Sequence, residues 1–508
     1  MIKSPSWLII KKSLFDHKEK DLISWKNIYS LKFRIIPVLI FLLVLILFFP
    51  GNSFSASKEI LRKQLENIVK SEPVFNEVKF GIYVKLLKDV YPVFDYNGNA
   101  PLVPASNLKV VTTACALERL GSKFRYETSL WGIIPIKDRN ELNSNLYIKG
   151  SGDPTFSYSF MDDPLKPFKD LADGLKRKGV NKINGDVVCD DWAFDRYFTA
   201  KGWKENYIFE SYAAPCGALS VNNNLVTVFN NGGSLKVYPP NSYAKFKKLN
   251  DGNEVWLEKE KGDDFIKVHG SNGLSSVYGV GITIYNPSMF SLGVFMNILK
   301  QKGITVTGKS RLYSIAMDEG YQKKTVKLAQ YNSCELSKIV KIINKESDNI
   351  CAQHLFKSLG YFIKGRGTTL NSYDAVNEFF CSSGIDPIGL VMDDGSGLSE
   401  KNKIKPKQLV AVLDHMYTKS KNKKVFWESL PFGGDTGSTL EYRLSGVPVR
   451  AKTGTLKGFV SLSGYVKTKK GQMLVFSFIF NNSQYSGDYI RGIEDKLVNT
   501  MAQFNQVL

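Results

Sequence analysis

A serine and a lysine three positions apart, Ser106 and Lys109, lie in the segment PASNLKVVTTACALERLG, residues 104–121. Pro104 and the apolar residues that follow at helical spacing predict that this pair opens a helix, which Gly121 ends. Residues three apart on a helix share one face, so the lysine amine can reach the serine hydroxyl. The positive end of the helix dipole also favours an alkoxide at Ser106. Such a pair can act as nucleophile and base if burial and another cation lower the pKa of the lysine.

The Ser-x-x-Lys spacing alone is weak evidence, because composition predicts roughly three or four such pairs in a chain of this length. Ser106 differs from the other pairs in its place at a predicted helix start. The further pairs of the same spacing are Ser55/Lys58, Ser242/Lys245 and Ser420/Lys423.

Two later motifs supply the other groups that this chemistry needs. Ser347-Asp348-Asn349 lies between two predicted helices, and Lys452-Thr453-Gly454 precedes a strand-like run. Ser347 offers a second hydroxyl that can pass a proton to a leaving amine, and Lys452 offers a cation for a substrate carboxylate. A strand edge at the second motif would present N–H groups to a peptide and to an oxyanion. Two of these residues also have a structural interpretation: Asn349 as a helix cap, and Thr453 as a strand former.

The elements that must position these residues belong to an α/β body interrupted by a mostly-β stretch. Residues 57–71 predict an amphipathic helix, and residues 79–99 predict two strands joined by a turn. Between residues 126 and 314, short β-like runs alternate with turn residues, and one helix is predicted over 289–303. The later predicted elements are helices over 336–347, 349–360 and 406–420, strands over 459–468 and 472–482, and a closing helix from about residue 490.

Residues 32–57 have the order of an export signal. Lys32 and Arg34 precede the apolar run 35–49, and Pro50 and small residues follow. Fifteen apolar residues are few for a spanning helix but suit a secretory signal. The chain before the run is long for such a signal, so two outcomes stay open: cleavage after a small residue, or retention as a membrane anchor. Either outcome predicts an exported protein of the periplasm or cell envelope.

The overall composition excludes several function classes. The net charge is +20, but the lysines are scattered, and we find no nucleic-acid-binding module, so no nucleic-acid partner is expected. There is no Cys-x-x-Cys, no His-Glu-x-x-His and no Gly-x-Ser-x-Gly, so neither a metal site, a cofactor nor a Ser-His-Asp hydrolase is predicted. Six cysteines in an exported chain permit disulfides, although spacing cannot choose a pairing. Cys115, on the apolar face of the first helix, is predicted to be a buried thiol.

Ser-x-x-Lys, Ser-Asp-Asn and Lys-Thr-Gly in this order form the set used by penicillin-binding proteins and serine β-lactamases. The chain closely resembles the D-alanyl-D-alanine carboxypeptidase/endopeptidases, the class C low-molecular-mass penicillin-binding proteins of the penicillin-binding protein 4 type. The long stretch between Ser106 and Ser347 matches this family's habit of inserting domains there. Further segments that resemble the family are GSGDPTF (150–156), GDVVCDDWAF (185–194), YAAPCGALSVNNN (212–224), DDGSGLS (393–399) and LPFGGDTGSTLEYRL (430–444).

The resemblance implies a fold class and a domain order. The fold is α/β (α+β), a transpeptidase domain like that of penicillin-binding proteins and serine β-lactamases, with mostly-β domains inserted between Ser-x-x-Lys and Ser-Asp-Asn. The implied domains are a signal peptide or anchor over 1–57, the first part of the catalytic domain over 58–125, the inserted domains over 126–314 and the second part of the catalytic domain over 315–508.

The resemblance also implies catalytic roles for the motif residues. Ser106 would be acylated with Lys109 as its base, and Ser347 would relay the proton to the leaving D-alanine. Asn349 would bind the substrate amide and help to hold Lys109, whereas Asp348 would point toward structure. Lys452 would supply positive charge near the substrate carboxylate.

Substrate binding is expected from a second set of residues. Thr453 and Thr455 would hydrogen-bond the carboxylate, Gly454 belongs to the same motif, and the N–H groups of Ser106 and Thr455 would form the oxyanion hole. Glu400 and Lys457, which depart from the family pattern, are candidates for contact with the third residue of the stem peptide. Asp190, in the segment GDVVCDDWAF, is a further substrate-binding candidate.

The predicted function is cleavage of D-Ala-D-Ala ends and cross-links of peptidoglycan stem peptides by a serine-type DD-carboxypeptidase and DD-endopeptidase. β-Lactam antibiotics would be covalent inhibitors, and the N-terminal segment is the one candidate for membrane association. Two alternatives remain: a penicillin-recognising fold that binds peptidoglycan without turnover, and a serine β-lactamase or esterase on the same fold.

Overall fold

The computed structural model describes residues 51–134, 140–231, 234–249, 251–271 and 278–508. The apolar run 35–49, on which the export prediction rests, lies outside the described residues. Among the described helices, none combines the length and the apolar character that a membrane crossing requires.

A five-stranded antiparallel sheet carries the Lys-Thr-Gly motif. Its strand order is β17-β18-β19-β1-β2, so that β1, from the start of the chain, pairs with β19, from its end, with Lys79 opposite Asn481. The strands are β1 (Lys79–Leu86), β2 (Pro92–Tyr96), β17 (Val449–Leu456), β18 (Phe459–Lys467) and β19 (Met473–Asn481).

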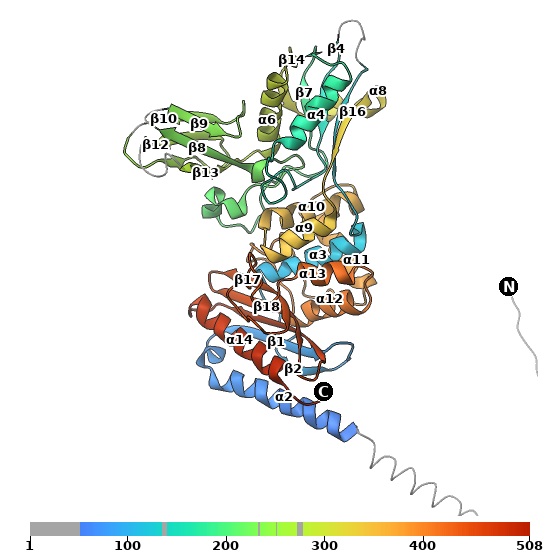
Figure 1. Ribbon diagram of the computed structural model, residues 1–508, viewed down its shortest axis with the longest axis vertical. Helices are drawn as coiled ribbons and strands as arrows, with labels where there is room; N and C mark the ends of the chain where they lie inside the picture. The colour runs from blue at the N-terminus through green and yellow to red at the C-terminus, as the bar shows by residue number, and fades with distance from the viewer. Residues whose placement is uncertain (1–50, 135–139, 232–233, 250, 272–277) are drawn as a thin grey trace, which may run out of the picture. The chain divides into compact units, whose positions relative to one another are not determined.

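The central strand β19 is apolar along nearly its whole length because both faces of the sheet are covered. Phe476, Phe478 and Phe480 pack on the face that is covered by α2 (Gly51–Ser71) and α14 (Gly487–Gln503). The alternate residues Val475 and Ile479 pack on the opposite face, against a group of helices. Figure 1 shows α2 and α14 beside this sheet.

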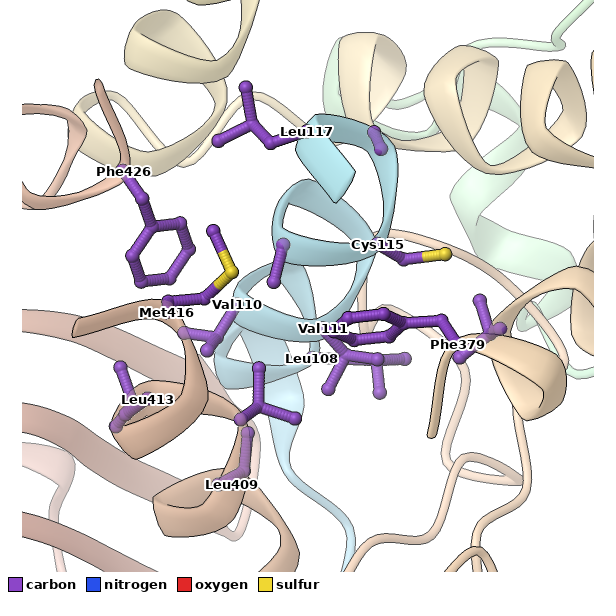
Figure 2. Close-up of a cluster of buried hydrophobic side chains, with 14 of the residues drawn as sticks. Leu108, Val110, Val111, Cys115, Leu117, Phe379, Leu409, Leu413, Met416 and Phe426 are labelled. Atoms are coloured by element: carbon purple, nitrogen blue, oxygen red, sulfur yellow. The ribbon is translucent and has the colours of Figure 1, made fainter. Parts of the chain in front are cut away.

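The helix that follows Ser106, α3 (Leu108–Leu120), is the centre of that helical group. Its apolar residues contact Phe379 of α11, Leu413 and Met416 of α12 and Phe426 of α13 (Figure 2). Residues 108–117 of α3 are all buried, so the helix is a rigid support for the residues at its first turn. The surrounding helices are α9 (Leu336–Lys345), α10 (Asn349–Lys364), α11 (Thr369–Ser382), α12 (Pro406–Thr418) and α13 (Lys423–Ser429).

Between α3 and α9 the described residues form four further sheets with a second hydrophobic core. The largest has the order β15-β7-β5-β3-β16, and the helices α4 (Lys166–Arg177) and α6 (Pro287–Gln301) contribute to its core. Its strands are β3 (Glu127–Gly132), β5 (Leu146–Lys149), β7 (Val187–Asp190), β15 (Ser310–Leu312) and β16 (Val326–Asn332). The three-stranded sheets consist of β4 (Glu141–Leu142), β6 (Lys182–Ile183) and β14 (Thr305–Val306); β8 (Leu225–Asn231), β9 (Ser234–Tyr238) and β13 (Val280–Thr283); and β10 (Lys245–Lys248), β11 (Trp256–Glu258) and β12 (Phe265–His269). Two single-turn helices, α7 (Ile315–Asp318) and α8 (Tyr321–Lys324), precede β16.

Most predicted elements are confirmed, including the helix after Ser106, which ends at Gly121 with a φ of 85°. The sequence prediction lacked α4, α11 and α13. The first contains a glycine, and the second is rich in Ser, Asn and Asp, which lowers helix propensity. Cys115 is a buried free thiol, as predicted, and the other five cysteines are also unpaired. The division of the chain into domains at residues 57, 125 and 314 stays a prediction.

Candidate active site

Ser106 lies in a single turn of 3₁₀ helix, Ala105–Asn107, that runs directly into α3. One turn later the fully buried Lys109 donates from Nζ to Ser106 Oγ at 3.0 Å. The expectation that the two side chains meet on one face is confirmed. Ala105, just before the serine, has a φ of 47°, a strained backbone conformation of the kind that concentrates at functional sites.

Lys109 has two further partners from distant parts of the chain. Its Nζ donates to Asn349 Oδ1 at 2.6 Å and to the backbone carbonyl of Ser396 at 2.7 Å. The amine is therefore held from three directions, and its position does not depend on a flexible surface side chain.

Burial lowers the pKa of Lys109 from its usual range to about 7, although the carboxylates of Asp394 and Asp348 act in the opposite direction. Burial also lowers the pKa of Lys452 well below its usual range, and repulsion by the charge of Lys109 adds to this effect. A depressed pKa at Lys109 was expected from both causes. Burial is the cause that lowers the pKa of Lys109, whereas repulsion between the two amines lowers the pKa of Lys452.

Lys452 connects the Lys-Thr-Gly strand to the Ser-Asp-Asn turn. Its Nζ donates to Ser347 Oγ at 2.9 Å and to the carbonyl of Thr453 at 2.9 Å. Ser347 has a φ of 62°, a second strained backbone conformation in the site. The two hydroxyls, Ser106 and Ser347, thus each have a buried amine within hydrogen-bond distance.

The Ser-Asp-Asn turn begins α10, and its Asp and Asn have different tasks. Asp348 caps the helix, accepting from the N–H of Cys351 at 2.8 Å, so its predicted structural role is confirmed. Asn349 is not the cap. Its Oδ1 accepts from Lys109, and its Nδ2 donates to the carbonyl of Tyr212 at 3.1 Å.

The contact of the loop 393–399 with Lys109 was not predicted from the sequence. Asp394 is fully buried and accepts from the N–H groups of Ser396, Gly397 and Ser399. This fold of the loop directs the Ser396 carbonyl at Lys109. Gly397 has a φ of 85°, and a Cβ atom there would lie 1.8 Å from the carbonyl oxygen of Ala105. The run DGSG, with two glycines beside an acidic residue, was the available signal.

Two side chains from outside the loop hold it in place. Trp203, from the inserted region, donates from Nε1 to Asp394 at 2.8 Å. Gln353 of α10 accepts from the N–H of Gly395 at 2.8 Å, so this side chain also holds the loop.

The Lys-Thr-Gly motif lies within β17, on a strand of its own rather than before one. Gly454 allows this strand to approach the turn that carries Ser106, because a Cβ atom there would lie 2.3 Å from Ser461 Oγ and 2.9 Å from the Pro104 carbonyl. Asn107 and Ser461 fix the approach: Asn107 Nδ2 donates to Ser461 Oγ at 2.5 Å, and Ser461 Oγ donates to the Pro104 carbonyl at 2.6 Å.

Two pockets open beside Ser106, and both contain Thr455. The first has a volume of about 540 Å³, and Ser347 and Thr453 also line it. The second has a volume of about 430 Å³ and is lined by Asn349 and Lys457. The inserted region completes the second pocket with Lys204, Asn206, Tyr207 and Tyr212.

Three residues outside the catalytic motifs, Glu400, Lys457 and Asp190, were predicted to bind substrate, and the structure places one of them in a pocket beside Ser106. Lys457 lines the second pocket. Glu400 lines neither pocket and forms an ion pair at 2.6 Å with Lys204, which lines the second. Asp190 is buried at the end of β7, where it accepts from Tyr321 Oη at 2.8 Å and from the N–H of Trp192, and it lines neither pocket beside Ser106.

Comparison with known proteins gives consistent results along nearly the whole described chain. The sequence model of the "D-Ala-D-Ala carboxypeptidase 3 (S13) family" matches residues 61–504. The chain is 29% identical over 473 residues to the D-alanyl-D-alanine carboxypeptidase of Actinomadura sp. (strain R39), covering 87% of this chain and 85% of that protein. It is 28% identical over 434 residues to the D-alanyl-D-alanine carboxypeptidase DacB of Haemophilus influenzae, covering 80% and 86%. The crystal structure of penicillin binding protein 4 (dacB) from Haemophilus influenzae superposes with a TM-score of 0.71 at 24% identity, covering 86% of this chain and 99% of that one.

Proposed function

The chain belongs to the D-Ala-D-Ala carboxypeptidase 3 (S13) family and is a serine-type D-Ala-D-Ala carboxypeptidase, and we propose that Ser106 is the serine that it acylates. The predicted family, fold class and enzyme class are confirmed. One observation supports the assignment of the nucleophile: Ser106 Oγ lies 3.0 Å from a buried amine whose pKa is lowered to about 7.

The contacts of Lys109 suit a base. A neutral amine has two hydrogens and one lone pair. The carbonyl oxygens of Asn349 and Ser396 accept the two hydrogens, and the lone pair is left for the hydroxyl proton of Ser106. A pKa of about 7 keeps a large fraction of Lys109 neutral at neutral pH, so the base is available before substrate arrives.

The proposed acylation follows from these positions. Ser106 Oγ attacks the carbonyl carbon of the penultimate D-alanine, and its proton passes to Lys109 Nζ. The N–H groups of Ser106 and Thr455 bind the oxyanion. Ser347, hydrogen-bonded to Lys452, gives its proton to the nitrogen of the leaving D-alanine and takes up the proton that Lys109 received from Ser106, and the C–N bond breaks. Water then hydrolyses the ester and restores Ser106, and the same steps open a cross-link when the leaving group is a second peptide.

Substrate binding is divided between the Lys-Thr-Gly motif and the Ser-Asp-Asn motif. Lys452 supplies positive charge near the carboxylate of the terminal D-alanine, because the negative charge of the bound carboxylate favours the protonated amine and opposes the effect of burial on its pKa. Thr453 and Thr455 hydrogen-bond the same carboxylate. Asn349 binds the amide of the acyl part, which lies in the second pocket beside Lys457. β-Lactams would acylate Ser106 by the same attack, consistent with a β-lactam complex of the Haemophilus influenzae penicillin binding protein 4.

Incubation with purified muropeptides tests this function. We expect the protein to release D-alanine from monomeric pentapeptides and to separate cross-linked dimers, and mass analysis of the products would identify both reactions. The products would also show which third residue of the stem peptide is accepted. Penicillin labelling without any product from either substrate would instead support a binding module without turnover.

We propose that the protein acts outside the cytoplasmic membrane and that residues 32–57 direct its export. Cell fractionation should find it in the envelope, released if the segment is cleaved and held at the membrane if the segment remains. Leu43→Asp together with Ile46→Asp, which place two charges in the apolar run, should retain the protein in the cytoplasm. A cytoplasmic location of the unmodified protein would contradict the proposal.

A further inference from the structure

The first pocket, of about 540 Å³, lies on the leaving-group side of Ser106. Two of its lining residues, Ser347 and Thr453, are those to which the proposed mechanism assigns the leaving nitrogen and its carboxylate. Asn349, which is assigned to the acyl part, lines the other pocket. The inference made here therefore rests on the proposed function.

The first pocket is much larger than D-alanine, the smallest leaving group of the proposed reaction. Pockets of about 300–1,000 Å³ enclose drug-sized ligands, whereas D-alanine is among the smallest amino acids. The wall of the first pocket away from Ser106 is formed by the segment Ser438–Arg443 and by the first turns of α14, which contribute Asp488 and Arg491. Tyr442 on this wall is 92% exposed, so the described part of the chain leaves its large ring open to solvent beside the pocket.

The two arginines that line the first pocket, Arg443 and Arg491, differ in how fully carboxylates compensate their charges. Arg443 is 13% exposed and is held by Glu494 at 2.9 Å and Asp495 at 2.7 Å, so two carboxylates already compensate its charge. Arg491 has one ion-pair partner among the described residues, Asp488 at 2.5 Å, whose side chain is 89% exposed. An ion pair open to solvent contributes little free energy. A carboxylate that enters the pocket can therefore displace Asp488 from Arg491.

We propose that this pocket receives a leaving group larger than D-alanine, the second stem peptide of a cross-link, and that Arg491 binds a free carboxylate of that peptide. A guanidinium binds a carboxylate through two parallel hydrogen bonds, which fixes orientation as well as charge. Tyr442 provides a surface on which the peptide backbone can pack. The pocket wall thereby sets the preference for cross-links over free D-Ala-D-Ala ends.

Arg491→Gln tests the proposal through a ratio, the kcat/KM for a cross-linked dimer divided by that for a monomeric pentapeptide. We expect this ratio to fall about ten-fold, the effect of losing one partly exposed charge-assisted contact. Arg491→Lys, which keeps the charge but not the two parallel hydrogen bonds, should lower the ratio by about three-fold. The matched control is Lys496→Gln, which removes a cation from the same helix outside the pocket and should leave the ratio unchanged.

A wild-type ratio in Arg491→Gln would overturn the proposal, and so would a wild-type protein that releases D-alanine from monomers but does not open dimers. Absence of product from both substrates in the wild type would instead overturn the proposed function itself. Equal losses on both substrates in Arg491→Gln would also count against the proposal, because they would place the arginine in a step common to the two reactions.

Discussion

Replacing Ser106 by alanine is expected to abolish covalent labelling by fluorescent penicillin. The variant lacks the oxygen that forms the acyl-enzyme, and loss of the nucleophile in a serine protease lowers the rate on the order of 10⁶-fold. The fold should be retained, because the serine side chain is small and its oxygen contacts Lys109 at a partly exposed position. Gel detection of the labelled protein, together with a thermal melt, measures both parts of this prediction.

The matched control is Ser242→Ala, because Ser242 and Lys245 have the same spacing in the sequence. Ser242 precedes β10 instead of a helix, and its oxygen lies near the Gly293 carbonyl. This variant should label like the wild type. Persistent labelling of Ser106→Ala would place the nucleophile elsewhere and overturn the assignment.

Lys109→Arg is expected to lose acylation almost completely at every pH, although the positive charge is kept. Guanidinium does not release its proton in proteins, so it cannot accept one from Ser106. In the wild type, Lys109 must be neutral to act, and its pKa is about 7. The acylation rate should therefore rise as the pH increases through about 7 and level off above it, which penicillin acylation measured across pH would show.

Lys452→Arg is the comparison for this variant. The role proposed for Lys452 needs a cation near the substrate carboxylate and not a proton acceptor, so part of the acylation rate should remain. A thermal melt of both variants separates loss of the base from misfolding, since both lysines are fully buried and arginine is larger. Near-wild-type acylation by Lys109→Arg would show that Lys109 is not the base, and Ser347 or a water molecule would have to take its place.

The local parts of the site could be predicted from the sequence because they depend on short spacing. A spacing of three residues on a helix brings Lys109 close to Ser106. The order of the three motifs indicated that the Ser-Asp-Asn and Lys-Thr-Gly residues would join this pair in one site. The helices and strands that carry these motifs also have clear apolar periodicity. Strand β17 was the exception: its residues Val449–Leu456 include polar motif residues, so the strand was placed only after the motif.

The remaining contacts could not be predicted because backbone atoms and distant segments make them. Lys109 donates to the carbonyl of Ser396, and Asn349 donates to the carbonyl of Tyr212. Every residue type has a backbone carbonyl, so the side chains at 396 and 212 do not indicate these contacts. Trp203, which holds Asp394 from the inserted region, resembles any other aromatic residue in a loop. Asp190 accepts from a buried tyrosine at the end of β7, and a polar residue at a strand end gives no sign in the sequence of whether it faces a pocket or such a partner.

The pairing of β1 with β19 affects the order in which the chain can fold. Lys79 of β1 lies opposite Asn481, so β1 gains this neighbour only after all the chain between the two strands has been made. The inserted sheets form from residues that lie closer together in the sequence and can fold earlier, since contacts at long sequence separation form slowly. A chain that stops before residue 473 would leave that edge of β1 unpaired, and an open strand edge promotes aggregation. Completion of this sheet therefore depends on synthesis of β19, and chains that end before this strand cannot close the sheet.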